Sequence, residues 1–411
     1  MKYRLTPPSL IDASINLPAS KSISNRVLIL NALAKNTQSI ENISNSDDTN
    51  VLLKALTGTS DTIDIGAAGT AMRFLTAYLA ITPGSRVLTG SERMKKRPIK
   101  ILVDALRQLG ASIRYVNEEG FPPLFIEGKP LEGGIIKING NISSQYISAL
   151  LMIAPMLKNG LCVEIAGELI SAPYVELTLQ LMKTFGVEST WEKSRISILP
   201  QAYTSTPYCI EGDWSAASYW YEMTALCPGS EIRLNGLFQN SLQGDAKVAG
   251  IFEQLGVTTL FSKKEVILSN NGKRPDRFDY NFINEPDLAQ AVAVTCALLK
   301  IPFHFEGVQS LKIKETDRIE ALRTELGKLG YLLEESNGST LAWNGAFSEP
   351  QQEATICTYD DHRMAMAFAP ACLITGAVTI NDPLVNSKSY PSFWNDLRTA
   401  GFSLLELDEK G

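Results

Sequence analysis

Lysine and arginine side chains recur where the sequence pattern predicts the first turn of a helix. The helix dipole disfavours cations at that end unless a bound anion offsets their charge. One case is Lys314 to Arg318, which precedes a helical pattern with Leu322, Leu326 and Leu329 on one face. Four of six successive chain segments carry such cations: Lys21, Arg26, Arg73, Arg93, Arg97, Lys314, Arg318, Arg363 and Lys388. The sequence therefore predicts a strongly anionic ligand with more than one phosphate or carboxylate group.

Neutral and acidic residues at other predicted helix starts allow two interpretations each. Serines near Lys21 and in the stretches 141–145 and 171–174 match the donors and acceptors that sugar hydroxyls and phosphates need, but serine is also a common helix cap. Asp287 stands at the head of an apolar helix, where a cap is more common than a catalytic base. Asp317 with Glu320 also fits an ordinary capping pair.

Two interleaved series of helical patterns recur at a nearly constant interval, which is shorter for the first segment. Each amphipathic helix ends in a glycine suited to a left-handed cap: Gly58, Gly110, Gly186, Gly256, Gly330 and Gly401. The more apolar helices end at Asn36, Gly84, Gly160, Gly229, Pro302 and Gly376. This pattern predicts six copies of a βαβαββ unit, each with one amphipathic helix and one nearly all-apolar helix that is buried on all sides.

Grouped by threes, the six units make two domains of ordinary size. Chain breaks at Pro18 and at Cys227-Pro228-Gly229 are the candidate hinges between them. The predicted domains are therefore a discontinuous one, 1–19 plus 229–411, and an inserted one, 20–228.

Composition excludes several other classes of function. The net charge is −6 and there is no basic run with interleaved aromatic residues, so nucleic acid is not expected as a partner. The longest apolar run, 364–380, contains Pro370 and Gly376 and fits a helix, a turn and a strand better than a membrane span. Six scattered cysteines indicate free thiols in a reducing cytoplasm, and the first residues lack the apolar run of an export signal. The two histidines have no neighbours at metal-ligand spacing, so no metal site is expected.

Five motifs, in order along the chain, resemble those of the 5-enolpyruvylshikimate-3-phosphate synthase family. They are Lys21 to Arg26, Gly69 to Arg73, Arg93 to Ile99, Lys314 to Arg318 and Asp361 to Met366. The resemblance implies a two-domain inside-out α/β barrel with three repeats per domain and an active site in the interdomain cleft. It further implies transfer of the enolpyruvyl group of phosphoenolpyruvate to the 5-hydroxyl of shikimate 3-phosphate, with release of phosphate through a tetrahedral intermediate, on the route to chorismate. We expect a cytoplasmic monomer that needs no cofactor.

The resemblance also implies roles for single residues. Phosphoenolpyruvate is expected on Lys21, Gly69, Arg97, Gln145, Arg318, Arg363 and Lys388. Shikimate 3-phosphate is expected on Ser22, Arg26, Ser143, Ser144, Gln145, Ser171, Tyr174, Asp287, Ser310 and Lys314. Thr70 and Arg73 are expected to support the site. The expected catalytic residues are Glu315 as proton carrier for the methylene carbon, Asp287 as base for the hydroxyl, and Lys21 at the leaving phosphate.

Two alternatives remain open at this point. The sister family transfers enolpyruvate to UDP-N-acetylglucosamine, and it typically carries a reactive cysteine in the loop that corresponds to residues 93–98, where this chain has none. A non-catalytic anion-binding paralogue would be marked by loss of Lys21, Asp287 or Glu315, and all three are present. The chain also departs from the common family pattern at three positions: Ala67, Phe74 and Ser310.

Overall fold

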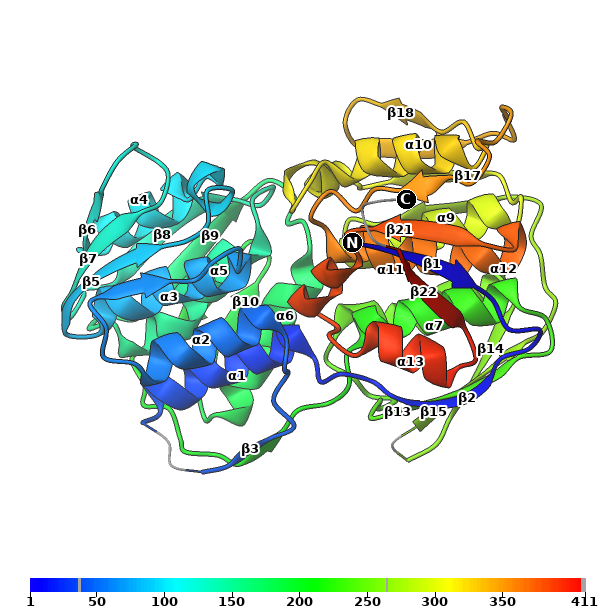
Figure 1. The fold of residues 1–411 in the computed structure, drawn as a ribbon. Helices are drawn as coiled ribbons and strands as arrows, with labels where there is room; N and C mark the ends of the chain where they lie inside the picture. The colour runs from blue at the N-terminus through cyan, green and yellow to red at the C-terminus, as the bar shows by residue number, and fades with distance from the viewer. Residues whose placement is uncertain (36–37, 264, 408–411) are drawn as a thin grey trace. The chain divides into compact units, whose positions relative to one another are not determined.

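The computed structural model describes residues 1–35, 38–263 and 265–407, and its chain forms two compact units (Figure 1). Unit 1 comprises the described parts of Met1–Ala19 and Glu211–Gly411, and unit 2 is Ser20–Ile210. Both units alternate helices with strands, so the predicted two-unit α/β class is confirmed. Asn36, the predicted end of the first apolar helix, lies outside the described residues.

Unit 2 contains short strands and longer helices in alternation. Its helices are α1 (Lys21–Leu33), α2 (Asp47–Thr57), α3 (Gly69–Ile81), α4 (Lys100–Gln108), α5 (Ser144–Ile153) and α6 (Ala172–Thr184), with the 3-10 helices η1 (Met94–Lys96) and η2 (Ala154–Met156). Its strands are β3 (Ile40–Glu41), β4 (Thr62–Asp64), β5 (Gly84–Thr89), β6 (Ser112–Tyr115), β7 (Leu124–Gly128), β8 (Gly134–Asn139), β9 (Leu161–Ala166), β10 (Thr190–Glu192), β11 (Arg195–Ile198) and β12 (Tyr208–Cys209).

Unit 1 is built in the same manner from both ends of the chain. Its helices are α7 (Trp214–Leu226), α8 (Val248–Gln254), α9 (Ala289–Leu298), α10 (Arg318–Lys328), α11 (His362–Phe368), α12 (Cys372–Thr375) and α13 (Phe393–Thr399). Its 3-10 helices are η3 (Gly244–Lys247), η4 (Pro286–Leu288), η5 (Gln309–Ile313), η6 (Ala369–Ala371) and η7 (Pro383–Lys388). Its strands are β1 (Lys2–Thr6), β2 (Asp12–Asn16), β13 (Glu231–Asn235), β14 (Val257–Phe261), β15 (Glu265–Asn270), β16 (Phe278–Asn281), β17 (Phe303–Glu306), β18 (Glu334–Ser336), β19 (Thr340–Trp343), β20 (Thr355–Ile356), β21 (Val378–Asn381) and β22 (Ser403–Leu407).

Five four-stranded sheets share one pattern, in which a parallel pair is extended by two antiparallel strands. Unit 2 holds β4-β5-β7-β6 and β8-β9-β11-β10, and unit 1 holds β2-β13-β15-β14, β16-β17-β19-β18 and β20-β21-β1-β22. This repetition is the βαβαββ unit that the helix spacing predicted. The sixth sheet is only the parallel pair β12 and β3, so the repeat with α1 and α2 is smaller than the other five. This smaller repeat explains why the first interval between helix ends in the sequence is shorter than the others.

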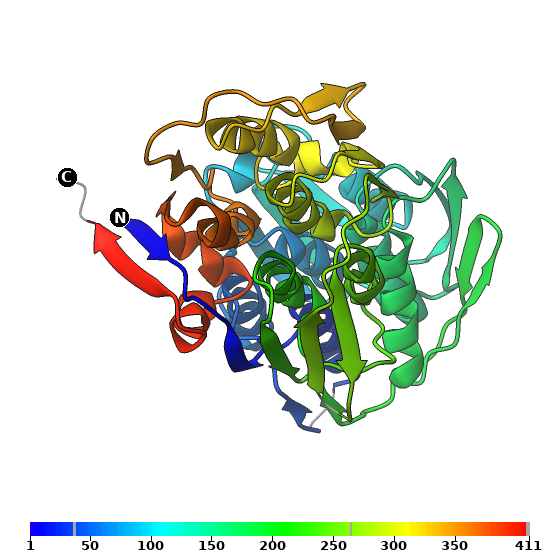
Figure 2. The same cartoon turned by 90° about the vertical axis from the view of Figure 1, so that its right-hand side faces the viewer.

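Each unit places its apolar helices inside and its sheets outside. Every residue of α9 and α11 is buried, and Ser215 is the one residue of α7 that is not. Figure 2 shows the helices of unit 1 at the centre with strands at the periphery. Because such a helix is surrounded by other elements, apolar residues occupy its whole circumference and the sequence shows no amphipathic stripe.

Five of the six predicted glycine caps have the left-handed backbone. Their φ angles are +99° at Gly110, +83° at Gly186, +95° at Gly256, +95° at Gly330 and +92° at Gly401. Gly58 differs, with φ of −83° and an extended backbone after α2. The backbone at Gly58 therefore does not require a glycine, and the predicted left-handed cap is wrong at this position.

The structure corrects the second predicted domain boundary, which falls after Ile210 and not after Pro228. The reason is helix α7, whose Trp214 and Trp220 are fully buried in the core of unit 1. The Cys227-Pro228-Gly229 break is a turn inside unit 1, where Ser230 N donates to Cys227 O at 3.3 Å between α7 and β13. The other boundary lies between Ala19 and Ser20, after the Pro18 break.

A buried carboxyl group in α7 predicts a pH dependence of stability. Glu222 is fully buried, neither of its carboxyl oxygens has a hydrogen-bond partner among the described residues, and burial raises its pKa well above the usual value. The unfolded chain ionises at an ordinary glutamate pKa, so stability is fully present below about pH 4.3 and is lost as the pH rises towards the folded pKa. The loss is at most ~1.4 kcal/mol per pH unit.

We therefore expect Glu222→Gln to raise the melting temperature, with a larger gain at pH 7 than at pH 5. The glutamine amide cannot ionise, so a higher pH does not stabilise the unfolded chain of the variant through ionisation at this position. Calorimetry at both pH values measures the effect, and Glu253→Gln on the exposed side of α8 is the matched control. Equal gains at the two pH values would contradict this prediction.

Candidate anion-binding and catalytic site

The start of α1 is joined to three other helices of unit 2. Lys21 lies in the first turn of α1, and its Nζ is 4.0 Å from Asp48 Oδ2 in the first turn of α2. Arg26 is buried, and its guanidinium donates to Thr178 Oγ1 at 2.7 Å and to Ser148 Oγ at 3.2 Å. Burial lowers the pKa of Arg26 from 12.5 to about 10. Arg26 thus connects α1 with α5 and α6, while Lys21 stays partly exposed.

Two further contacts of Arg26 involve predicted substrate-binding positions. Its Nη1 donates to Ser22 O at 2.9 Å and its Nη2 donates to Tyr174 O at 3.2 Å. The guanidinium also lies 5.4 Å from the ring centroid of Phe74. Phe74, one of the departures from the family pattern, therefore contributes a cation–π contact to a buried cation.

Gly69, Arg73 and Arg97 come together at the start of α3. Arg73 Nη1 donates to Gly69 O at 3.0 Å, and its guanidinium lies 5.7 Å from the ring centroid of Tyr146. A Cβ on Gly69 would stand 2.8 Å from Arg97 Nη1. The absence of a side chain at position 69 thus lets two guanidinium groups approach the first turn of a helix, where free backbone amides also favour an anion.

The starts of α5 and α6 complete the polar set of unit 2. Gln145 Nε2 donates to Thr70 Oγ1 at 3.2 Å, which links the first turns of α5 and α3. Ser143 caps α5 and accepts from Gln145 N at 3.3 Å, while Ser144 is buried in the first turn. Ser171 precedes α6 with a left-handed backbone, φ +56°. We call Lys21, Arg26, Gly69, Thr70, Arg73, Arg97 and Gln145 the unit 2 cluster.

If the anion at this helix start is phosphoenolpyruvate, as the sequence resemblance implies, Gly69→Ala should raise its KM about tenfold and leave the KM for shikimate 3-phosphate nearly unchanged. The new Cβ would lie 2.8 and 3.2 Å from Arg97 nitrogens and 3.2 Å from Arg73 Nη1, so these guanidinium groups must move. Overpacking of this kind costs about 1–3 kcal/mol, and ~1.4 kcal/mol corresponds to tenfold. Steady-state kinetics with each substrate varied measures the effect. Gly250→Ala is the control, because a Cβ at that position meets open space. The prediction would be refuted if Gly69→Ala and the unaltered enzyme had the same KM for phosphoenolpyruvate.

Arg318 is the centre of the polar cluster in unit 1. Its side chain is 2 % exposed, and its Nε donates to Asp361 Oδ2 at 2.7 Å. Its Nη2 donates to Glu315 Oε2 at 2.8 Å and its Nη1 donates to Asp287 Oδ1 at 3.2 Å. Burial opposes the charged guanidinium, but the three carboxylates outweigh burial and raise the pKa of Arg318 above its ordinary value. Arg318 is therefore a fixed cation that aligns three carboxylates from three different segments.

Two cations besides Arg318 form ion pairs with the Asp287 carboxylate. Arg363 Nη2 lies 2.9 Å from Asp287 Oδ2, and Lys314 Nζ lies 3.6 Å from Oδ1. Arg363 Nη1 also donates to the backbone carbonyl of Asp287 at 3.0 Å. Asp287 lies in the first turn of the 3-10 helix η4, whose N-cap is Glu285, and its role as a base stays a prediction.

Lys314 and Glu315 are neighbours in the sequence but pair with different groups. In the structure Lys314 lies beside Asp287, while Arg318 donates to Glu315. Lys388, at the end of η7, donates to the backbone carbonyl of Asp360 next to Asp361. Ser310 lies in η5, before Lys314. We call Asp287, Lys314, Glu315, Arg318, Asp361, Arg363 and Lys388 the Arg318 cluster.

The prediction that Asp317 is a helix cap is confirmed. Asp317 Oδ1 accepts from the backbone amides of Ile319 at 3.1 Å and Glu320 at 3.2 Å, so it caps α10. This cap fixes the first turn of α10 and with it the direction of Arg318.

Two acidic residues of this region were not predicted as site residues. Asp361 is fully buried, accepts from Arg318 and caps α11 through Arg363 N at 2.9 Å. Asp245 is buried in η3 and bonds the hydroxyl of Ser215. Burial, with a further contribution from the charge of Asp287, raises the pKa of Asp245 to about 7. Asp361 was visible as part of a motif, whereas the sequence around Asp245 carries no signal of burial beside an acidic group.

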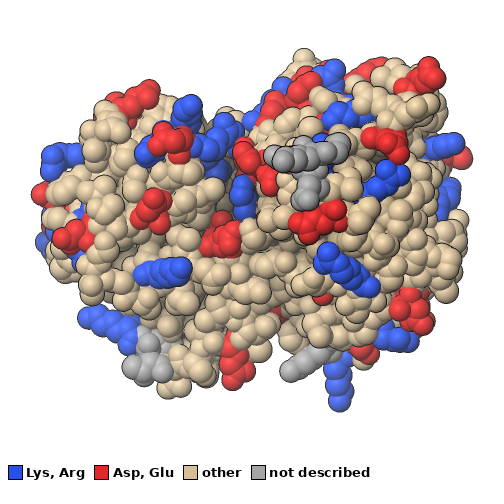
Figure 3. Space-filling view, viewed as in Figure 1, with Lys and Arg blue, Asp and Glu red and all other residues tan. Residues whose placement is uncertain are grey.

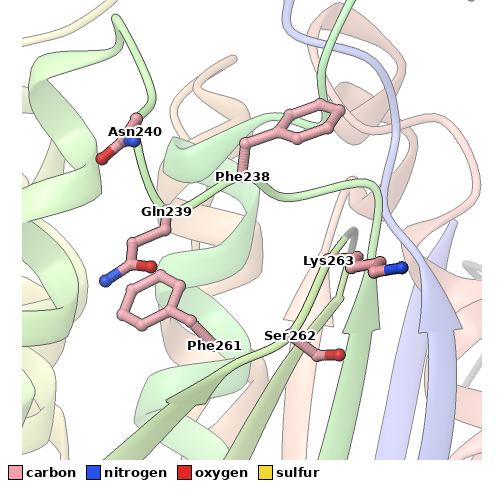
Figure 4. Close-up of a pocket in the computed structure, with 6 residues that line it drawn as sticks. All are labelled: Phe238, Gln239, Asn240, Phe261, Ser262 and Lys263. Atoms are coloured by element: carbon pink, nitrogen blue, oxygen red, sulfur yellow. The ribbon is translucent and has the colours of Figure 1, made fainter.

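Away from these clusters the surface carries both charge signs in alternation. Figure 3 shows lysine and arginine interspersed with aspartate and glutamate over the visible faces of both units. A cavity of about 660 Å³ in unit 1 is lined by Phe238, Gln239, Asn240, Phe261, Ser262 and Lys263 (Figure 4). It contains none of the predicted site residues. The described helices include no segment with the length and apolar character needed to cross a bilayer.

Comparisons of this chain with known proteins agree on one family. The family model described as EPSP synthase (3-phosphoshikimate 1-carboxyvinyltransferase) matches residues 5–59 and 57–397. A Bacteroides fragilis (strain YCH46) protein named 3-phosphoshikimate 1-carboxyvinyltransferase is 57% identical over 98% of this chain and 99% of its own length. A Vibrio cholerae serotype O1 (strain M66-2) protein of the same name is 39% identical over 95% of this chain and 97% of its own length. The solved structure of EPSP synthase from Acinetobacter baumannii superimposes with a TM-score of 0.77 at 21% identity, covering 98% of this chain and 100% of that one, which shows a shared fold.

Proposed function

The chain belongs to the EPSP synthase (3-phosphoshikimate 1-carboxyvinyltransferase) family, and from this membership we propose that its two polar clusters act on the two substrates of one reaction. The activity is transfer of the enolpyruvyl group of phosphoenolpyruvate to shikimate 3-phosphate, with release of phosphate. The transfer joins carbon 2 of phosphoenolpyruvate to the 5-hydroxyl oxygen, so both substrates must be held at the same time. We therefore propose roles in this reaction for residues of each unit, and we propose that the reaction needs no metal or organic cofactor.

The observation that carries the assignment in unit 1 is the Arg318 cluster. Arg318, Arg363 and Lys388 are proposed to hold the carboxylate and phosphate of phosphoenolpyruvate, together with Lys21, Gly69, Arg97 and Gln145 of unit 2. Four cations of the Arg318 cluster stand against three carboxylates, which favours a further anion. Guanidinium groups fixed by neighbouring carboxylates bind such an anion with little loss of side-chain freedom.

Shikimate 3-phosphate is assigned mainly to the hydroxyl-rich helix starts of unit 2. Their side chains offer donors and acceptors for a ring with several hydroxyl groups, and the neighbouring cations suit its phosphate. The proposed residues are Ser22, Arg26, Ser143, Ser144, Gln145, Ser171 and Tyr174 in unit 2, and Asp287, Ser310 and Lys314 in unit 1. Thr70 and Arg73 support this set through their contacts with Gln145 and Gly69.

The proton transfers are assigned to two carboxylates of the Arg318 cluster. Asp287 is the proposed base for the 5-hydroxyl, since three cations keep it as an acceptor until substrate anions take over part of their charge. Glu315 is the proposed proton carrier for the methylene carbon, because the charge of bound phosphoenolpyruvate favours a protonated carboxyl beside it. Loss of phosphate from the tetrahedral intermediate, together with return of one proton from its methyl group to Glu315, then forms the enol ether product, with Lys21 at the leaving phosphate.

The first experiment measures phosphate release from phosphoenolpyruvate with each possible acceptor. Release that requires shikimate 3-phosphate supports the proposal, and release that requires UDP-N-acetylglucosamine in its place would assign the chain to the sister activity. Binding of shikimate 3-phosphate without any release would indicate a non-catalytic paralogue. The same preparation, analysed by sedimentation, tests the proposal that the enzyme is a monomer, and its recovery in the cytoplasmic fraction tests the proposed location.

Lys21→Met should lower kcat by roughly 10²- to 10³-fold, the loss that follows removal of one group stabilising transition-state charge. Methionine keeps the length of the side chain but cannot neutralise the leaving phosphate. Rapid-quench measurement of phosphate release detects the change, and Lys54→Met on the exposed face of α2 is the control. If Lys21→Met and Lys54→Met had the same kcat, the proposed role of Lys21 at the leaving phosphate would be wrong.

A further inference from the structure

A fully buried carboxylate on α10 contacts the segment that leads into the Arg318 cluster. Glu325 lies seven residues after Arg318, so both side chains project from the same face of the helix, about 10 Å apart along its axis. The side chain of Glu325 is 0% exposed. A charge at such a position is expensive unless it is fully paired and hydrogen-bonded, so its partners indicate what the residue is for.

Glu325 has four hydrogen bonds, and two of them come from the segment 357–359. Lys328 Nζ donates to both carboxylate oxygens, at 2.9 and 2.6 Å. The hydroxyl of Tyr359 donates to Oε1 at 2.5 Å, and the backbone amide of Cys357 donates to Oε2 at 3.1 Å. Lys328 also donates to the carbonyl of Thr355 at 3.0 Å. The pair Glu325 and Lys328 therefore attaches the whole stretch from 355 to 359 to α10.

This stretch ends in a backbone conformation that needs external support. Tyr359 and Asp360 are successive residues with φ of +54° and +56°, in the left-handed region that side chains other than glycine rarely adopt. Strained residues of this kind persist where their surroundings hold them in place. The hydrogen bond from Tyr359 to Glu325 supplies that support at the first of the two residues.

Asp360 and Asp361, which follow Tyr359, are hydrogen-bonded to three of the four cationic residues of the Arg318 cluster. Lys388 donates to the carbonyl of Asp360, Arg318 donates to the carboxylate of Asp361, and Arg363 begins the helix that Asp361 caps. A shift of the turn at 359–360 would therefore move the contacts of Arg318, Arg363 and Lys388 together. None of the atoms of Glu325 belongs to that cluster.

We propose that Glu325 is a positioning residue for phosphoenolpyruvate binding, which it supports by fixing the turn at Tyr359 and Asp360. The inference rests on the proposed assignment of Arg318, Arg363 and Lys388 to phosphoenolpyruvate. Glu325 acts on them through the Cys357 amide and the Tyr359 hydroxyl, and its hydrogen bonds go to none of the residues assigned to shikimate 3-phosphate. Its removal should consequently affect one substrate more than the other.

The test compares Glu325→Gln and Tyr359→Phe with the unaltered enzyme at a temperature well below the melting transition of each. Both variants should raise the KM for phosphoenolpyruvate about tenfold or more, the size seen when supporting partners of ligand-holding side chains are changed. The KM for shikimate 3-phosphate should change less than twofold. Glu222→Gln, the same substitution at another fully buried carboxyl of unit 1, should change neither KM.

Three results would overturn the inference. They are an unchanged KM for phosphoenolpyruvate in Glu325→Gln, an equal rise of both KM values, which would indicate general loosening, and the same kinetic change in Glu222→Gln. If Glu325→Gln does not fold, Tyr359→Phe decides alone, since it keeps the ring and removes only the hydroxyl. Lys388→Met distinguishes an error in the assignment of the Arg318 cluster to phosphoenolpyruvate from an error in the role of Glu325. A normal KM for phosphoenolpyruvate in Lys388→Met would refute the assignment of the cluster, whereas a raised one beside a normal Glu325→Gln would refute only the role of Glu325.

Discussion

Asparagine in place of Asp287 should lower kcat by roughly 10²- to 10⁴-fold, the usual contribution of a positioned acid or base. The amide retains the shape of the side chain but cannot take the proton of the 5-hydroxyl. It also removes the shared counter-charge of Arg318, Arg363 and Lys314, which leaves the cluster more positive. The KM for phosphoenolpyruvate should therefore stay constant or fall, although catalysis is nearly lost.

This division between kcat and KM makes the prediction specific to the proposed role. Steady-state kinetics with phosphoenolpyruvate varied at saturating shikimate 3-phosphate gives both constants. Asp279→Asn is the matched control, because Asp279 lies in β16 of the same unit, is exposed and pairs with Arg277 outside the cluster. A kcat for Asp287→Asn within threefold of the control would show that another group takes the hydroxyl proton.

Glutamine in place of Glu315 should also lower kcat by about 10² or more, and here the loss lies in protonation of the methylene carbon. Reversible protonation at this carbon exchanges its hydrogens with solvent. In D₂O, the unaltered enzyme with both substrates should incorporate deuterium into the methylene group of phosphoenolpyruvate, and Glu315→Gln should not. Proton magnetic resonance of the residual phosphoenolpyruvate measures the exchange.

The geometry allows this substitution to be interpreted cleanly. Arg318 keeps its bonds to Asp361 at 2.7 Å and Asp287 at 3.2 Å when its bond to Glu315 is weakened, so the rest of the cluster should hold its shape. Glu320→Gln is the control, because Glu320 is exposed in the first turn of α10 and pairs with Arg323 outside the cluster. Deuterium incorporation in Glu315→Gln at the rate of the control would assign the proton transfer to a different group.

The helix-start argument was sufficient to find most of the polar clusters from sequence. Cations such as Arg318 and Lys21 are unusual at a helix start, and the dipole gives a physical reason to suspect an anion. The repeat of apolar helices similarly predicted the βαβαββ units, because burial on all sides leaves a recognisable composition. These features depend on residues that are close together in the chain.

The features that sequence did not predict depend on partners far apart in the chain. The pairing of Arg318 with Asp361 and the burial of Asp245 near Asp287 each join separate segments, and no local pattern encodes such distances. The boundary after Ile210 was missed for a related reason. Pro228 and Gly229 form a conspicuous break, but the core contacts of Trp214 and Trp220 decide which unit contains α7.

The pairing of the first strand with the last has a consequence for the order in which the chain folds during synthesis. Lys2 in β1 pairs with Leu407 in β22, so β1 has no sheet neighbour on that side until the ribosome has added residue 407. Unit 2 is complete in sequence by Ile210 and can form earlier, since domains generally fold as units while translation continues. Once folded, it holds the ends of its own segment close together, as the backbone bond from Asp213 N to Pro18 O records at 2.9 Å. An early-folding insert thus shortens the loop that the late-folding unit must close, and it lowers the entropy cost of joining the two ends of the chain.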